Sequence, residues 1–116
     1  MHERKTLEEL REELKNDKIL TAILGMNATE VEIYFGLIGK EMSIDEISER
    51  FGIEKSSAYK CVGKLYRKGL LKRKKMNFSN GYNYLYISEN PQKLMSLAKS
   101  RIAQWCEAID SFSNES

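Results

Sequence analysis

The sequence predicts a mainly α-helical protein with one small β-hairpin, and three observations lead to this fold class. Most of the 116 residues fall in segments whose apolar side chains recur every three or four positions, the spacing of amphipathic helices. Two of these segments begin with Asn or Ser followed by Glu three residues later, the capping-box pattern of a helix start. One segment alternates with period two around Asn80-Gly81, a dipeptide typical of hairpin turns.

Length and composition favour one folded domain with helical extensions. A hydrophobic content of 41% and a charged content of 31% are typical of globular proteins, whereas disordered chains lack this many apolar residues. No apolar run approaches the roughly 18 residues that cross a bilayer, and the amino terminus leads into an acidic amphipathic stretch. We therefore expect a cytoplasmic protein without a membrane partner.

Charge is concentrated in one segment. From Lys55 to Ser88 the chain has no acidic residue, and because the formal net charge is only +2, the +9 of this segment leaves −7 for the rest. Such a separation predicts a polyanionic partner, with nucleic acid as the first candidate. The nine basic residues are Lys55, Lys60, Lys64, Arg67, Lys68, Lys72, Arg73, Lys74 and Lys75.

The sequence gives no sign of an enzyme, a metal site or a cofactor site. Cys61 and Cys106 are far apart, with His2 as the single imidazole, so they cannot form a zinc site. We expect both thiols to be small buried core groups. The chain has no Gly-rich phosphate loop and no nucleophile beside a base.

Residues 6–24 are expected to form a helix that Asn16-Asp17 could interrupt, with one apolar stripe formed by Leu7, Leu10 and Leu14. Gly25 is a helix stop, and Asn27 with Glu30 starts a second helix through about residue 38. The core face predicted for that second helix consists of Val31, Tyr34, Phe35 and Ile38.

A short helix follows from Ser43, whose capping box includes Glu46, and it ends at Gly52. A tight connection then leads into a helix over about residues 55–68 that is closed by Gly69. A helical wheel places the inner face of this helix on Ala58, Cys61, Val62 and Leu65. The outer stripe is Ser56, Lys60, Gly63 and Arg67, flanked by Ser57, Tyr59 and Lys64. The two helices form a helix-turn-helix.

The hairpin is expected to join Leu70–Met76 to Tyr82–Ile87. With Asn80-Gly81 as the turn, Met76 lies opposite Leu85 and Lys75 opposite Tyr86. Apolar residues then share one face of the ribbon, and the other face carries Arg73, Lys75, Tyr84 and Tyr86. Tyrosines at this spacing indicate cross-strand packing more often than base stacking.

Asn90-Pro91 predicts the start of a last helix, which runs to about residue 112. Its apolar stripe alternates spacings of three and four along its whole length, which requires a partner helix. That partner could lie in the same chain, in a second copy or in another protein, and we favour a homodimer. The expected dimerisation residues are Leu7, Leu10, Leu14, Met95, Ala98, Ile102, Trp105, Ile109 and Phe112.

The predicted elements form a winged helix-turn-helix over residues 26–88, between an N-terminal helical extension (1–25) and a C-terminal helix (89–116). The runs 24–39, 44–53 and 56–71 resemble archaeal and bacterial regulators of the TrmB-like and MarR-like kind, and the resemblance covers about half of the chain. The resemblance implies a dimeric transcription regulator with the second motif helix in the major groove. One helix follows the domain where TrmB-like regulators carry a sugar-binding domain, and in layout the chain is similar to small archaeal Lrs14-like regulators.

The predicted function is sequence-specific binding of double-stranded DNA by a transcription regulator. Base reading is expected from Ser56, Ser57, Tyr59 and Lys60, with Lys64 and Arg67 on phosphates or a purine. The wing residues expected on the backbone or minor groove are Lys72, Arg73, Lys74, Lys75 and Asn80. An alternative is a protein-interaction module in a transcription or degradation assembly, where these cations are solvated or protect a strand edge. Binding to RNA is a third hypothesis.

Overall fold

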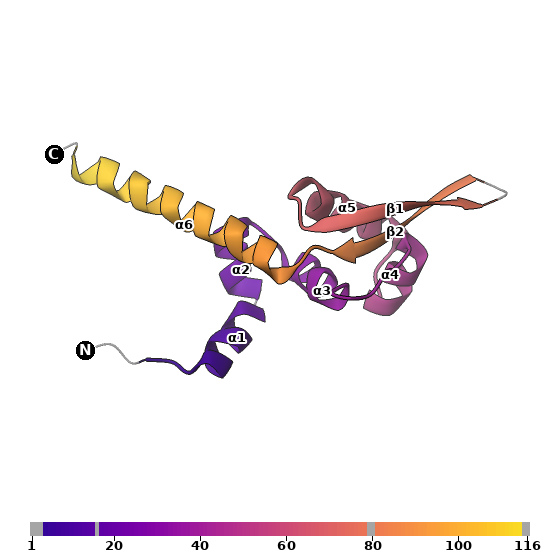
Figure 1. Cartoon of the computed structure of the whole chain (residues 1–116), viewed down its shortest axis with the longest axis horizontal. Coiled ribbons are helices and arrows are strands. Elements are labelled where there is room, and N and C mark those ends of the chain that lie inside the picture. Colours follow the sequence, from indigo (N-terminus) through magenta and orange to yellow (C-terminus); the bar gives the residue numbers. More distant parts are fainter. Residues whose placement is uncertain (1–3, 16, 79–80, 115–116) are drawn as a thin grey trace.

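The computed structural model describes residues 4–15, 17–78 and 81–114. Figure 1 shows a central body from which α6 extends to one end of the molecule while the hairpin extends to the other, over a longest dimension of 64 Å. In chain order the elements are α1 (Leu7–Lys15), α2 (Asp17–Leu24), α3 (Ala28–Gly36), α4 (Ile44–Phe51), α5 (Lys55–Arg67), β1 (Leu71–Phe78), β2 (Gly81–Ser88) and α6 (Pro91–Ser113). The mainly α-helical fold class with one hairpin is confirmed.

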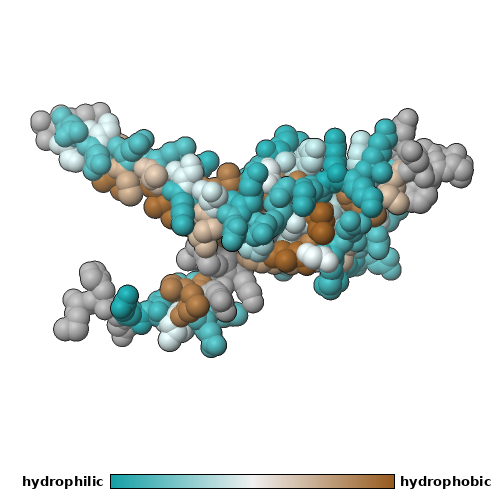
Figure 2. Space-filling model, in the orientation of Figure 1, coloured by the Kyte–Doolittle hydropathy of each residue, from teal (hydrophilic) through white to brown (hydrophobic). Residues whose placement is uncertain are grey.

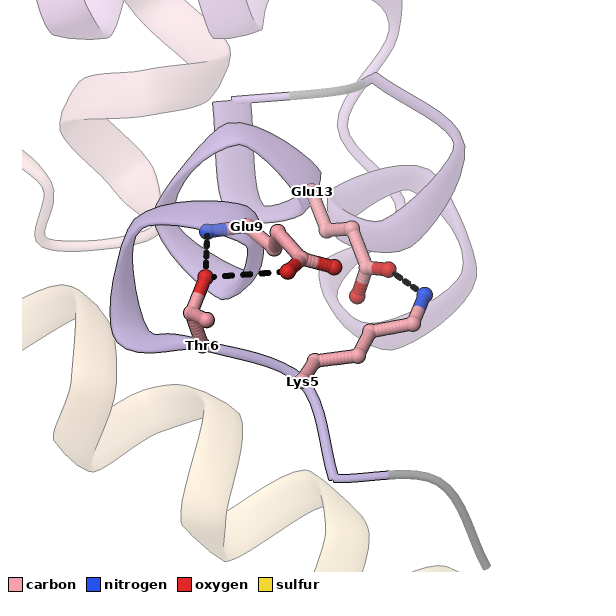
Figure 3. Close-up of polar contacts among 4 residues, drawn as sticks. All are labelled: Lys5, Thr6, Glu9 and Glu13. Atoms are coloured by element: carbon pink, nitrogen blue, oxygen red, sulfur yellow. Dashed lines mark hydrogen bonds and ion pairs between the residues drawn. The ribbon is translucent and has the colours of Figure 1, made fainter.

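The amino-terminal helix α1 begins at a side-chain cap. The backbone N–H of Glu9 donates to the Thr6 hydroxyl at 3.2 Å, and Lys5 forms an ion pair with Glu13, one turn beyond Glu9 (Figure 3). Asn16, where an interruption was expected, lies outside the described residues, and the described helices end and begin on either side of it. In place of the single helix predicted over 6–24, the described residues form two helices, α1 and α2.

Both predicted capping boxes are present. The N–H of Glu30 donates to the Asn27 side chain at 2.8 Å and the Glu30 carboxylate accepts from the Asn27 N–H at 3.0 Å. Ser43 and Glu46 make the same reciprocal pair at the start of α4. Each box satisfies backbone donors that a helix start otherwise leaves without partners.

Helix α3 ends two residues earlier than predicted, and this changes which side chains are buried. Because the helix stops at Gly36, Ile38 no longer follows the helical wheel and is 37% exposed, whereas Leu37 is fully buried. The expectation that Ile38 belongs to the core was wrong. Ile33, which the predicted face omitted, is also fully buried.

One core is built from the inner faces of α2 to α5, the base of the hairpin and the start of α6. Its largest fully buried side chain is Tyr34, whose hydroxyl donates to the backbone oxygen of Glu89 at 3.0 Å. The Ser88 hydroxyl donates in turn to the backbone oxygen of Tyr34. These two bonds tie the centre of α3 to the segment between β2 and α6. Burial, assisted by the nearby Glu89 carboxylate, raises the pKa of Tyr34 to about 12.

The helix-turn-helix forms as predicted. Gly52 ends α4 in the left-handed conformation, with φ of 62°, where glycine costs little. The predicted inner face of α5 is buried: Ala58, Cys61, Val62 and Leu65. Burial also raises the pKa of the Cys61 thiol. The second thiol, Cys106, is exposed, and the expectation of a core position for it was wrong because α6 leaves the body before reaching it.

The hairpin forms with a register different from the predicted one. Met76 lies opposite Asn83 and Lys75 opposite Tyr84, so β1 is shifted by two residues relative to the expected pairing. A shift of two preserves the alternation of faces, and Arg73, Lys75, Tyr84 and Tyr86 still share one face. At the base, Tyr86 and Met42 exchange two backbone hydrogen bonds of 2.8 and 2.9 Å.

Among the residues that the structure describes, helix α6 has buried side chains in its first half only. Leu94 and Ala98 are buried, with α2 packed alongside, whereas every residue from 101 to 114 is exposed. No helix in the described part of the chain has the length and apolar composition needed to cross a bilayer.

Candidate nucleic-acid interface

The outer face of α5 is an open surface. Ser56, Lys60 and Arg67 are exposed along one stripe, and a methyl group built at Gly63 would meet only the end of the Arg67 side chain, at 3.4 Å. The flanking residues Ser57, Tyr59 and Lys64 are exposed as well. Since the opposite face of α5 is held in the core, the helix is fixed in place with its hydroxyl groups and cations outward.

Lys55 and Lys68, at the two ends of α5, form ion pairs. The Lys55 ammonium lies 2.8 Å from the Asp45 carboxylate, and this hydrogen bond and charge raise its pKa. At the other end, the Lys68 ammonium lies 3.8 Å from Glu30, whose side chain is 1% exposed. Glu30 otherwise bonds the start of α3, so this pair links the C-terminal end of α5 to α3.

The wing cations are divided between two faces of the hairpin. Because side chains alternate along a strand, Lys72 and Lys74 point to the face opposite Arg73 and Lys75. All four are exposed. The nine cations therefore do not form one flat surface. The remaining predicted wing residue, Asn80, lies outside the described residues.

The face of the wing that points toward α5 is aromatic. The Arg73 guanidinium carbon lies 4.4 Å from the ring centroids of both Tyr66, on α5, and Tyr84, on β2. The rings of Tyr84 and Tyr86 are 6.2 Å apart, and Tyr86 is only 6% exposed. Tyr84 and Tyr86 lie two residues apart on the same strand, so their ring contact is not a cross-strand one, whereas the contact of Arg73 with Tyr84 crosses the two strands and favours packing for Tyr84. The side chain of Tyr82 lies outside the described part.

Tyr66 is the residue of this surface that the sequence reasoning missed. On the helical wheel it lies beside Tyr59, at the edge of the outer stripe. Tyr66 follows Tyr59 by seven residues, or two helical turns, and this spacing could have placed both tyrosines on the same side of the helix.

The predicted dimerisation stripe divides into two parts. Ala98 is buried within the chain, whereas the other α6 members are exposed by 42 to 73%: Met95, Ile102, Trp105, Ile109 and Phe112. On α1, Leu7 and Leu10 are exposed, and the side chain of Leu14 is not among those described. Figure 2 shows apolar surface along the side of α6 that faces α1.

The described residues contain no group of three or more histidines, cysteines, aspartates or glutamates placed to hold a metal ion.

A helix-turn-helix of α4 and α5, joined to a two-stranded hairpin, defines a winged helix-turn-helix domain, the DNA-binding unit of a large class of transcription regulators. Residues 20–92 match the model of the sugar-specific transcriptional regulator TrmB family, and the chain belongs to this family. Both family and fold are those of transcription regulators rather than of enzymes.

The chain is also similar to proteins of known sequence or structure outside the family model. The uncharacterized protein MJ1503 of Methanocaldococcus jannaschii is 27% identical over 85% of this chain and 76% of its own length. A solved structure described as a possible transcriptional regulator of Methanosarcina mazei has a TM-score of 0.80 at 17% identity, covering 84% of this chain and 85% of that one. The transcriptional regulator Tm0710 of Thermotoga maritima has a TM-score of 0.58 at 20% identity, covering 90% and 75%. At these identities the structural likeness shows the fold.

Proposed function

We propose that this protein is a sequence-specific regulator that binds double-stranded DNA by placing α5 in the major groove. The observation that carries this proposal is the outer face of α5, where exposed hydroxyl groups and cations share one stripe on a helix whose other side is core. A helix about 10–12 Å across fits a major groove about 12 Å wide. The acidic residues of the chain lie outside the 55–88 segment, so the phosphate backbone meets little repulsion there.

Different residues of α5 have different tasks in this arrangement. Ser56, Ser57, Tyr59 and Lys60 lie in the first two turns, and the start of a recognition helix is the part that reaches base edges. Farther along the helix, Lys64 and Arg67 neutralise phosphates. Such contacts position the protein, while hydrogen bonds to the bases carry the sequence preference.

The wing approaches the neighbouring backbone or the minor groove. Lys72 and Lys74 on one face, and Lys75 on the other, can contact phosphates on either side of a narrow ribbon. Because the two faces carry separate cations, the wing makes these contacts by entering between two phosphate strands rather than by lying flat on one.

We further propose that two copies pair through the exposed stripe of α6, together with the apolar side of α1. Five large apolar side chains in a row on a helix that leaves the body are a surface that water contacts unfavourably. Symmetric pairing buries the same stripe on both copies and presents two α5 helices to one duplex. The expected binding site is then an inverted repeat with half-sites about 10 bp apart, centre to centre.

The direct experiment is selection of bound duplexes from a random pool by the full chain at two salt concentrations. A shared motif with inverted symmetry is expected, and Lys60→Ala is expected to relax one position of each half-site. A variant with Lys40→Ala, which removes an exposed lysine between α3 and α4, is the matched control and should select the same motif. Enrichment of no motif would point to the protein-interaction function, and equal binding of double-stranded RNA would point to RNA.

A further inference from the structure

Arg73 differs from the other wing cations in what surrounds its charge. Its guanidinium carbon is equidistant, at 4.4 Å, from the ring centroids of Tyr66 and Tyr84. One of these rings belongs to α5 and the other to β2, so a single side chain of β1 connects the recognition helix with both strands of the wing. Each contact is well inside the roughly 6 Å limit for attraction between a cation and an aromatic face.

We propose that Arg73 is a positioning residue that fixes the wing against the recognition helix, and that it does not act as a phosphate contact. This inference rests on the proposed function, since it names which wing cation does not touch DNA. A planar guanidinium can face a ring on both of its sides, which a lysine ammonium cannot do. The two rings therefore select arginine at this position, whereas phosphate neutralisation would accept lysine.

The place of Arg73 along the hairpin explains why such a link is useful. The base of the wing is held by the buried Leu71 and by the backbone pair between Tyr86 and Met42. Tyr84 lies two residues farther out on β2 than Tyr86, and its contact with Arg73 extends the attachment to α5 beyond that base. The angle between helix and wing decides whether both reach the same duplex.

The causes of the pKa shift of Tyr86 also indicate that the Arg73 guanidinium lies close to the tyrosine side chains of the wing. Burial raises the pKa of Tyr86, and a hydrogen bond from Arg73 together with its positive charge acts in the opposite direction. Arg73 therefore interacts with the aromatic residue directly across from it in the register as well as with the two rings around it.

The first test uses the free protein and needs no DNA. Amide hydrogen exchange of residues 83–87 should become about fivefold faster in Arg73→Lys and in Tyr66→Leu, because both variants lose the contact between the Arg73 guanidinium and the Tyr66 ring. Lys74→Gln, a change on the opposite face of the same strand, should leave it unchanged. Unaltered exchange in Arg73→Lys, with circular dichroism confirming the fold, would overturn the proposal.

The second test compares duplex binding of variants at the same two positions. Arg73→Gln and Tyr66→Leu should each weaken binding about three- to tenfold at one salt concentration, and the double variant should be no weaker than the worse single one. Arg73→Gln should keep the wild-type salt slope, whereas removal of a phosphate contact lowers it by about 0.9. A lowered slope together with unchanged exchange identifies Arg73 as a phosphate contact and refutes the positioning role.

The two tests separate this inference from the proposed function. If the wild-type protein binds no duplex, the proposed function fails, while faster exchange in Arg73→Lys and Tyr66→Leu still supports the link between wing and helix.

Discussion

The exposed stripe of α6 allows a quantitative prediction about pairing. Complete burial of one large apolar side chain stabilises by about 2 kcal/mol. If a second copy covers the exposed fractions of the five large apolar side chains in the α6 stripe, the dimer gains about 5 kcal/mol per chain. Ile109 and Phe112, 65% and 73% exposed, account for more than half of this. Replacing both with aspartate removes that contribution and places two carboxylates in an apolar interface.

We expect the Ile109→Asp, Phe112→Asp variant to be a monomer at tens of micromolar concentration, where the wild type is a dimer, because a decrease of about 6 kcal/mol per dimer weakens association by about four orders of magnitude. Sedimentation velocity measures this directly. Gln104→Asp with Ser111→Asp adds the same charge on the opposite side of α6 and should leave the dimer intact. A monomeric wild type, or a double-aspartate variant that remains dimeric, would refute the reasoning.

Three further predictions concern the stability of the fold. Leu65→Ala should lower the free energy of unfolding by about 2–5 kcal/mol in denaturant titrations, because Leu65 is fully buried on the inner face of α5. Ser43→Ala should cost about 1 kcal/mol by removing the side-chain acceptor of the α4 capping box, and Ser43→Asp should restore most of it. The pKa of Tyr34 is about 12 in the folded state and about 10 in the unfolded state, so the free energy of unfolding should fall as the pH rises from about 10 to 12. Tyr34→Phe should flatten that part of the plot of stability against pH.

Local chemistry explains what the sequence predicted correctly. The capping boxes at Asn27 and Ser43 and the left-handed residue at Gly52 depend on a few neighbouring residues, so their patterns identify them. The buried face of α5 follows from helical periodicity alone. These features place the recognition helix and its outer stripe, which is the main part of the candidate interface.

Tertiary contacts explain what the sequence could not predict. The hairpin register is invisible to alternation, because a shift of two residues leaves every side chain on the same face. The position of Arg73 between Tyr66 and Tyr84 depends on two elements meeting in space. Likewise, periodicity along α6 does not reveal where the helix leaves the body. The sequence therefore could not show that Ala98 is buried within the chain and Cys106 exposed to solvent.

The central claim is that the outer face of α5 meets the phosphates and bases of duplex DNA, and the salt dependence of duplex binding tests it most directly. The account predicts that the logarithm of the binding constant falls linearly with the logarithm of salt concentration, with a slope of several units for the wild type. Lys64→Gln with Arg67→Gln should reduce the slope by about 1.8, because each phosphate that is no longer neutralised lowers it by about 0.9. A wild-type slope near zero, or a double variant with the wild-type slope, would contradict the account.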